Sequence, residues 1–170
     1  MHSLTLTDVL RCRHRSLQTR IAALEFDGRS RRVRVVQLAE ELVAHATVEQ
    51  LVVYPYAEEL LGVRDLSVEI ESALDALLAV VGGIDKEAEF KCAVGRLSTA
   101  FQRHVEGDEI GLLPRVESMA PADHLTRMGR AIEEFERTLA NSRMDDVSRG
   151  WQGASDDVLL NSAARGGGRN

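Results

Sequence analysis

The stretch His45-Ala-Thr-Val-Glu49-Gln-Leu-Val-Val-Tyr-Pro55 has a second version 59 positions later, His104-Val-Glu-Gly-Asp108-Glu-Ile-Gly-Leu-Leu-Pro114. Both copies place an acid four residues after a histidine and end in a proline, and they use two of the chain's three prolines. Positions i and i+4 share one face of a helix, so each copy can aim an imidazole and a carboxylate at one point. The repeat therefore predicts two helices that present polar groups to a common centre.

A weaker repeat, offset by 57 positions, relates the two other helices of the predicted core. It aligns Asp8 with Asp65 and His14 with Glu71, together with the apolar residues that follow each pair. The chain then consists of two helical hairpins of similar design. We predict an all-α protein built on an antiparallel four-helix bundle.

Apolar residues recur at helical spacing in five segments. The predicted helices cover about residues 7–26, 31–61, 67–81, 86–113 and 122–139. We expect Pro55 to bend the second helix and Pro114 to end the fourth, and the fifth is a short extra C-terminal helix. Residues 1–141 form the bundle domain. Residues 142–170 are rich in Gly and Ser and form a mobile tail, since few apolar groups offset the entropy of ordering them.

Composition excludes several classes of function. The chain has 170 residues, 44% of them hydrophobic, which suits a single core. A net charge of −6 argues against nucleic-acid binding. No apolar run approaches the roughly 18 residues of a membrane span, and the N-terminus lacks the apolar core of a signal peptide. With two cysteines, Cys12 and Cys92, a cytoplasmic protein without disulfides is expected, with Cys12 buried.

Aligning the repeats selects six candidate metal ligands, one or two from each bundle helix. They are His14, His45, Glu49, Glu71, His104 and Asp108. Mixed nitrogen and oxygen donors without a thiolate favour a di-iron or di-manganese centre over structural zinc. Alternatively, Glu71 faces solvent and the site holds one metal ion or none. Tyr56, seven residues beyond Glu49, projects onto the ligand face and could support a ligand, while Val52 and Gly111 would line the space beside the metals.

The two eleven-residue stretches resemble the His-x-x-x-Glu motifs of hemerythrin-like (HHE) cation-binding domains, and the resemblance covers about residues 4–139. It implies iron ligation by His14, His45, Glu49, His104 and Asp108, with both carboxylates as candidate bridges. The implied cofactor is two iron ions, oxo- or hydroxo-bridged, with manganese or zinc as alternatives. Glu71 stands where the family usually has a further histidine. Other acids that could be recruited are Glu69, Asp75 and, in place of Asp108, Glu109.

The resemblance implies a protein that handles O₂, peroxide or NO, in redox sensing or in peroxide removal. A carboxylate in place of an imidazole stabilises the higher oxidation state, so we expect irreversible reaction with O₂ or peroxide rather than reversible O₂ carriage. One alternative is a carboxylate-rich oxidase or oxygenase acting on a small organic substrate. Another is a metal-free helical module that binds a protein partner. Neither a nucleic acid nor a membrane is an expected partner.

Overall fold

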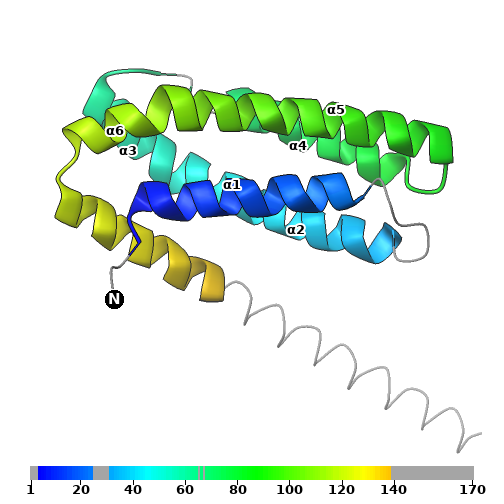
Figure 1. The fold of residues 1–170 in the computed structure, drawn as a ribbon, viewed down its shortest axis with the longest axis horizontal. Coiled ribbons are helices and arrows are strands. Elements are labelled where there is room, and N and C mark those ends of the chain that lie inside the picture. The colour runs from blue at the N-terminus through cyan, green and yellow to red at the C-terminus, as the bar shows by residue number, and fades with distance from the viewer. Residues whose placement is uncertain (1–3, 25–30, 65, 67, 139–170) are drawn as a thin grey trace, which may run out of the picture. The chain divides into compact units, whose positions relative to one another are not determined.

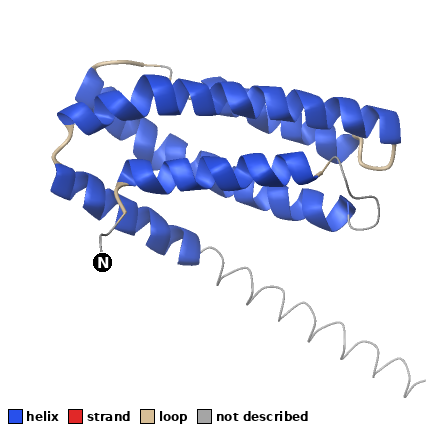
Figure 2. Cartoon of the chain, in the orientation of Figure 1, coloured by secondary structure: helices blue, strands red, loops and turns tan. Residues whose placement is uncertain are grey.

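The computed structural model describes residues 4–24, 31–64, 66 and 68–138. All regular elements in these residues are helices, as Figure 2 shows, which confirms the all-α class for this part of the chain. Contacts divide the chain into two units, Met1–Ile132 and Glu133–Asn170. The predicted tail, 142–170, falls outside the described residues. Within them, each helix is too short or too polar to traverse a lipid bilayer.

The described residues form five continuous helical segments. The elements are α1 (Leu6–Ala23), α2 (Arg31–Val48), η1 (Glu49–Val53), α3 (Tyr54–Leu61), α4 (Val68–Gly82), α5 (Glu87–Glu106), η2 (Gly107–Leu112) and α6 (Leu113–Met119). A further helix covers residues 122–138. α2, η1 and α3 follow one another without a break, and so do α5, η2 and α6.

The segments η1 and η2 are π-helical turns that lie at matching places in the two repeated stretches. Tyr54 N–H donates to the carbonyl of Glu49, and Leu113 N–H donates to that of Asp108, five residues back in each case. Each π turn leads into a helix that carries a proline in its first turn. The prediction that Pro114 ends its helix is wrong, because a proline in the first turn of a helix does not break it.

Helices α1, α2, α4 and α5 lie side by side, as Figure 1 shows. α1 contacts α2 and α5, while α4 contacts α2 and α5. Their inward faces share one hydrophobic core, in which large apolar side chains such as Leu42, Phe90 and Leu97 are almost fully buried. Burial of such side chains is the main force that holds amphipathic helices together.

Local sequence sets several helix ends. Thr5 and Asp8 form a capping box at the start of α1, each side chain accepting a hydrogen bond from the other residue's backbone N–H. α3 ends at Gly62, whose φ of 65° is favourable only for glycine. Gly129 allows the helix over residues 122–138 to pack closely against the backbone just before α1. A Cβ at this position would lie only 2.6 Å from the Leu4 carbonyl oxygen.

Candidate metal centre

His14 enters the core as one member of the apolar stripe of α1. Leu10, His14, Leu17 and Ile21 are spaced by three or four residues and are all buried. None of the His14 surface is exposed to solvent. An imidazole is a costly group to bury unless its nitrogens find partners, so the surroundings of His14 identify the polar part of the core.

His45 and Glu49 lie one turn apart where α2 passes into η1. Both are buried, and His45 Nε2 is 3.1 Å from Glu49 Oε1. His14 Nε2 approaches the same carboxylate oxygen from α1 at 3.3 Å. Two imidazoles from different helices therefore share one oxygen of Glu49.

His104 approaches the other oxygen of the same carboxylate. It is buried near the end of α5, with Nε2 3.4 Å from Glu49 Oε2 and 3.3 Å from His45 Nε2. The ligand atoms of His14, His45, Glu49 and His104 all lie within 4.8 Å of one another. We call these four residues the His/Glu cluster.

The spacing of these donor atoms fits a bound cation. A tetrahedral ion about 2.0–2.1 Å from each ligand separates neighbouring ligand atoms by about 3.3–3.4 Å. The three Nε2-to-carboxylate distances and the Nε2-to-Nε2 distance are 3.1–3.4 Å. Three imidazoles and one carboxylate are also a donor set that suits iron, zinc or copper. The His/Glu cluster can therefore hold a metal ion.

Electrostatics keep the cluster carboxylate ionised. Burial opposes ionisation of Glu49, but the nearby His45 and the hydrogen bond from His104 hold its pKa well below the usual range. Burial lowers the pKa of His45 in spite of the Glu49 charge. For His104, burial also acts to lower the pKa, but the hydrogen bond and charge of Glu49 outweigh it and raise the value. The centre thus contains one stable anion among imidazoles.

Asp108 lies beside the cluster as a second buried carboxyl group. Its Oδ2 is buried and has no hydrogen-bond partner, and the same is true of His104 Nδ1. Burial and the nearby charge of Glu49 raise the pKa of Asp108 to about 8. An orphaned buried oxygen next to a cluster of ligands is a position that a cation would satisfy.

Tyr54 touches the centre although the sequence pattern does not select it. Its hydroxyl donates to Glu49 Oε2 at 3.3 Å, and burial together with the Glu49 charge raises its pKa. Tyr54 lies five residues after Glu49, so an α-helical period does not bring the two together, whereas the π turn of η1 does. The contact between Tyr54 and Glu49 is therefore predictable only if the π turn itself is predicted.

The predicted neighbours of the site lie elsewhere. Tyr56 is half-buried and stacks on His124 with ring centroids 5.0 Å apart. Val52 is 40% exposed, and Gly111 is exposed as well. The sequence prediction assumes a regular α-helix after Glu49 and Asp108. Because η1 and η2 are π turns, the residues that this assumption places on the ligand face point in other directions.

Glu71 is not brought to the His/Glu cluster. It is exposed on α4, whose buried face consists of Ile70, Ala73, Leu77 and Val80. Residue 71 follows Ile70 by one position, which turns its side chain by about 100° on a helix. Glu71 and His14 hold equivalent positions in the repeat, but His14 points into the core and Glu71 points to solvent. Cys12, expected to be buried, is exposed.

Glu109 supplies a contact from outside the cluster. Its Oε1 is 2.9 Å from His14 Nδ1, and its side chain is 28% exposed. The adjacent residue, Asp108, faces Glu49 instead. η2 therefore presents two consecutive acids to the centre, one buried and one at its edge.

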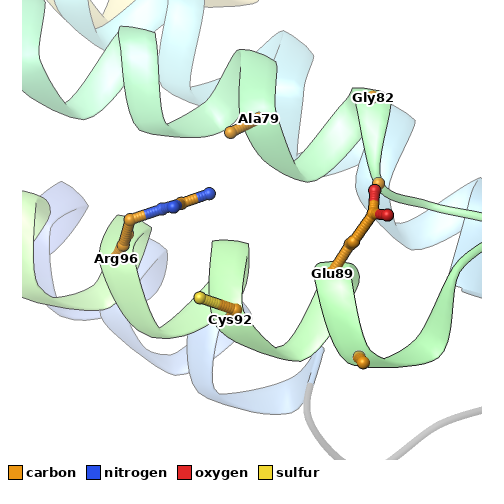
Figure 3. Close-up of a pocket in the computed structure, with 7 residues that line it drawn as sticks. Ala79, Gly82, Glu89, Cys92 and Arg96 are labelled. Carbon is orange, nitrogen blue, oxygen red and sulfur yellow. The ribbon is translucent and has the colours of Figure 1, made fainter.

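Two surface pockets lie between α4 and α5. One, of about 420 Å³, includes Ala79, Cys92 and Arg96 among its lining residues, as Figure 3 shows. The other, of about 600 Å³, extends along the same helices to Ser72 and Arg103. No residue of the His/Glu cluster lines either pocket.

No family model, curated protein or solved structure matches this chain. Its function is therefore inferred from its own side chains.

Proposed function

We propose that this protein is a non-haem iron protein whose centre reacts with O₂, peroxide or NO. The ion would be held by His14, His45, Glu49 and His104. The observation that supports this most strongly is the convergence of three imidazole Nε2 atoms on one buried, ionised carboxylate. Iron, when bound, would supply electron exchange with these small molecules.

A purely structural role explains the cluster less well. His45 Nε2 and His104 Nε2 are 3.3 Å apart, and a proton on one nitrogen can serve only one such contact. Buried polar groups are normally paired, yet His104 Nδ1 and Asp108 Oδ2 have no partner. A cation would use the lone pairs of all three imidazoles together and offset the cost of burying them.

The donor set supports iron over structural zinc. Structural zinc sites usually include thiolates, and both cysteines of this chain are exposed and free. Free thiols also suit a reducing compartment, and we propose that the protein acts in the cytoplasm. Neither of the two pockets between α4 and α5 includes a cluster residue, so these pockets do not support an oxidase with an organic substrate.

We further propose that the chain is a divergent hemerythrin-like four-helix bundle. The equivalent positions of η1 and η2, each followed by a proline, extend the repeat from sequence to backbone. A second iron would have Asp108 and Glu49 as its carboxylate ligands. The inward face of α4 is apolar, so this second position has fewer ligands than the first. One tightly held ion and one weak one are therefore expected.

Metal analysis tests this proposal. Apo-protein is reconstituted with Fe(II) under anaerobic conditions, desalted and analysed for iron per chain, then mixed with O₂ or NO while its absorption spectrum is followed. We expect about one retained iron, a spectral change on mixing, and loss of both in His14→Ala. His124→Ala, which removes a histidine outside the cluster, should match the wild type. Absence of retained iron in the folded wild type would refute the proposal.

A further inference from the structure

The cluster histidines differ in what their second ring nitrogen meets. His104 Nδ1 is buried and has no partner. His14 Nδ1 lies 2.9 Å from Glu109 Oε1, while His14 Nε2 lies 3.3 Å from Glu49 Oε1. His14 is therefore placed between two carboxylates, one inside the cluster and one outside it.

This arrangement selects one form of the ring. A neutral imidazole carries a single N–H, and an ionised carboxylate can only accept a hydrogen bond. The shorter contact is the one to Glu109, so the proton is favoured on Nδ1, and Nε2 then offers its lone pair to the centre. Metal-binding histidines are commonly oriented by such a carboxylate on the other nitrogen.

Glu109 lies at the edge of the centre, next to solvent and to a basic side chain. Its side chain reaches solvent, unlike those of the four cluster residues, which are buried. On the same side of the molecule, Arg11 lies close enough for the Glu109 charge to raise its pKa, after the stronger effect of its direct partner Glu117.

We propose that Glu109 is a positioning residue for the metal centre. It accepts the Nδ1–H bond of His14 and so fixes the tautomer and the ring orientation in which Nε2 donates to the cation. This inference rests on the proposed metal-binding function. It assigns Glu109 no direct bond to the metal, in contrast to a role as a substitute ligand for Asp108.

The test compares Glu109→Ala and Glu109→Gln with Glu117→Gln. Glu117 is an exposed acid that also interacts with Arg11, so its variant changes the same charge without touching His14. The probe is Co(II) alone, titrated into apo-protein in competition with a chelator. We expect Glu109→Ala to weaken affinity roughly 10- to 100-fold. Glu109→Gln, whose amide oxygen still accepts the Nδ1–H bond, should lose less, and Glu117→Gln should match the wild type.

A second measurement does not depend on the metal. Long-range ¹H–¹⁵N spectra of the apo-protein identify which nitrogen of His14 carries the proton. We expect the Nδ1–H form in the wild type and in Glu109→Gln, and a mixture of forms in Glu109→Ala. Should Glu109→Ala fail to fold, Glu109→Gln still provides a test, because its Co(II) affinity must fall below that of Glu117→Gln.

The outcomes separate the inference from the function on which it rests. If the wild type retains no Co(II) or Fe(II), the proposed function itself is wrong. If the wild type binds and Glu109→Ala binds equally well, the function stands and the positioning role is refuted. Loss of affinity in Glu109→Ala with an unchanged His14 tautomer would also refute it, because Glu109 would then act as a ligand.

Discussion

Glu49 is the side chain on which the whole centre depends. Three imidazole nitrogens from three helices lie 3.1–3.4 Å from its two oxygens, and Tyr54 donates to one of them. Its lowered pKa keeps it anionic without a metal. It can therefore organise the histidines before any cation arrives.

We expect Glu49→Gln to abolish metal retention and to destabilise the apo-protein. A neutral amide cannot replace the charge, and each hydrogen bond to a charged group contributes about 1.5–3 kcal/mol. Urea unfolding and metal analysis measure the two effects. Glu71→Gln removes the same charge from an exposed position on α4 and should change neither. Equal metal loss in both variants would return Glu71 to the list of ligands.

Asp108 makes the stability of the apo-protein depend on pH, and the direction of the dependence follows from its pKa. Its pKa is about 8 in the folded protein and about 3.9 in an unfolded chain. The folded state therefore binds the proton more tightly, and this contribution to stability is full below pH 3.9 and lost as pH rises through about 8. We expect the free energy of unfolding of the metal-free protein to fall between about pH 4 and pH 8.

Asp108→Asn should remove most of this fall, because an amide does not titrate. Asp75→Asn, on the exposed face of α4, is the matched control and should keep the wild-type slope. Chemical unfolding at several pH values in the presence of a chelator provides the measurement. If the free energy of unfolding changed with pH equally in all three proteins, Asp108 would not be the group responsible.

At the scale of the element, η1 and η2 determine which side chains reach the centre. A π turn holds one more residue than an α turn, so it changes the direction of every side chain that follows. Tyr54 reaches Glu49, and Tyr56 stacks on His124 instead. The direction of the residues beyond Glu49 and Asp108 therefore depends on one extra residue in each helix.

Deletion of Leu51 tests the role of η1. Leu51 is 71% exposed, so its removal leaves the core composition unchanged but shortens the π turn to an α turn. Tyr54 would then follow Glu49 by four positions, so an α turn in place of the π turn would still bring the tyrosine to the Glu49 carboxylate. We therefore expect metal affinity and thermal stability to stay close to those of the wild type, and a large loss of either would mean that the π turn itself is required. Leu51→Ala keeps the π turn and, as an exposed substitution, should lie within about 0.5 kcal/mol of the wild type.

Much of the helical pattern is predictable from sequence because apolar spacing reports it directly. The helix predicted over 31–61 ends as expected at Leu61, and the one predicted over 67–81 runs from Val68 to Gly82. The convergence of His14, His45, Glu49 and His104 was also predictable, since these positions continue the helical spacing of the buried apolar residues beside them.

Other features depend on backbone geometry that spacing does not encode. The π turns have no signal in an apolar pattern, so the pattern does not indicate Tyr54 and instead predicts Tyr56, Val52 and Gly111 at the site. The offset of 57 positions aligned Glu71 with His14 through apolar neighbours, but the neighbour that α4 buries is Ile70. An alignment of two repeats can be wrong by one residue. On a helix, one residue changes the direction of a side chain by about 100°, which is enough to turn a carboxylate from the core to solvent.

At the scale of the whole molecule, metal binding and stability are linked. The cluster joins α1, the α2–η1 segment and α5, so a cation bound there stabilises their packing. An ion present at 100 times its dissociation constant would add about 2.7 kcal/mol. For a domain of this size, each kcal/mol raises Tm by roughly 2–4 °C. Differential scanning fluorimetry with and without a chelator should show the difference.

The control for this prediction is a variant with an incomplete cluster. His45→Ala should unfold at the same temperature with and without the chelator, because it has lost one of the ligands. A chelator effect of equal size in His45→Ala would mean that the ion acts elsewhere on the protein.

The contact between His14 and Glu109 joins residues 95 positions apart. A chain emerging from the ribosome could not close the pocket around a cation until both repeats had been synthesised and the outer helices had docked. Metal binding would then be a late event in maturation, and a chain that ended before α5 would not bind the ion.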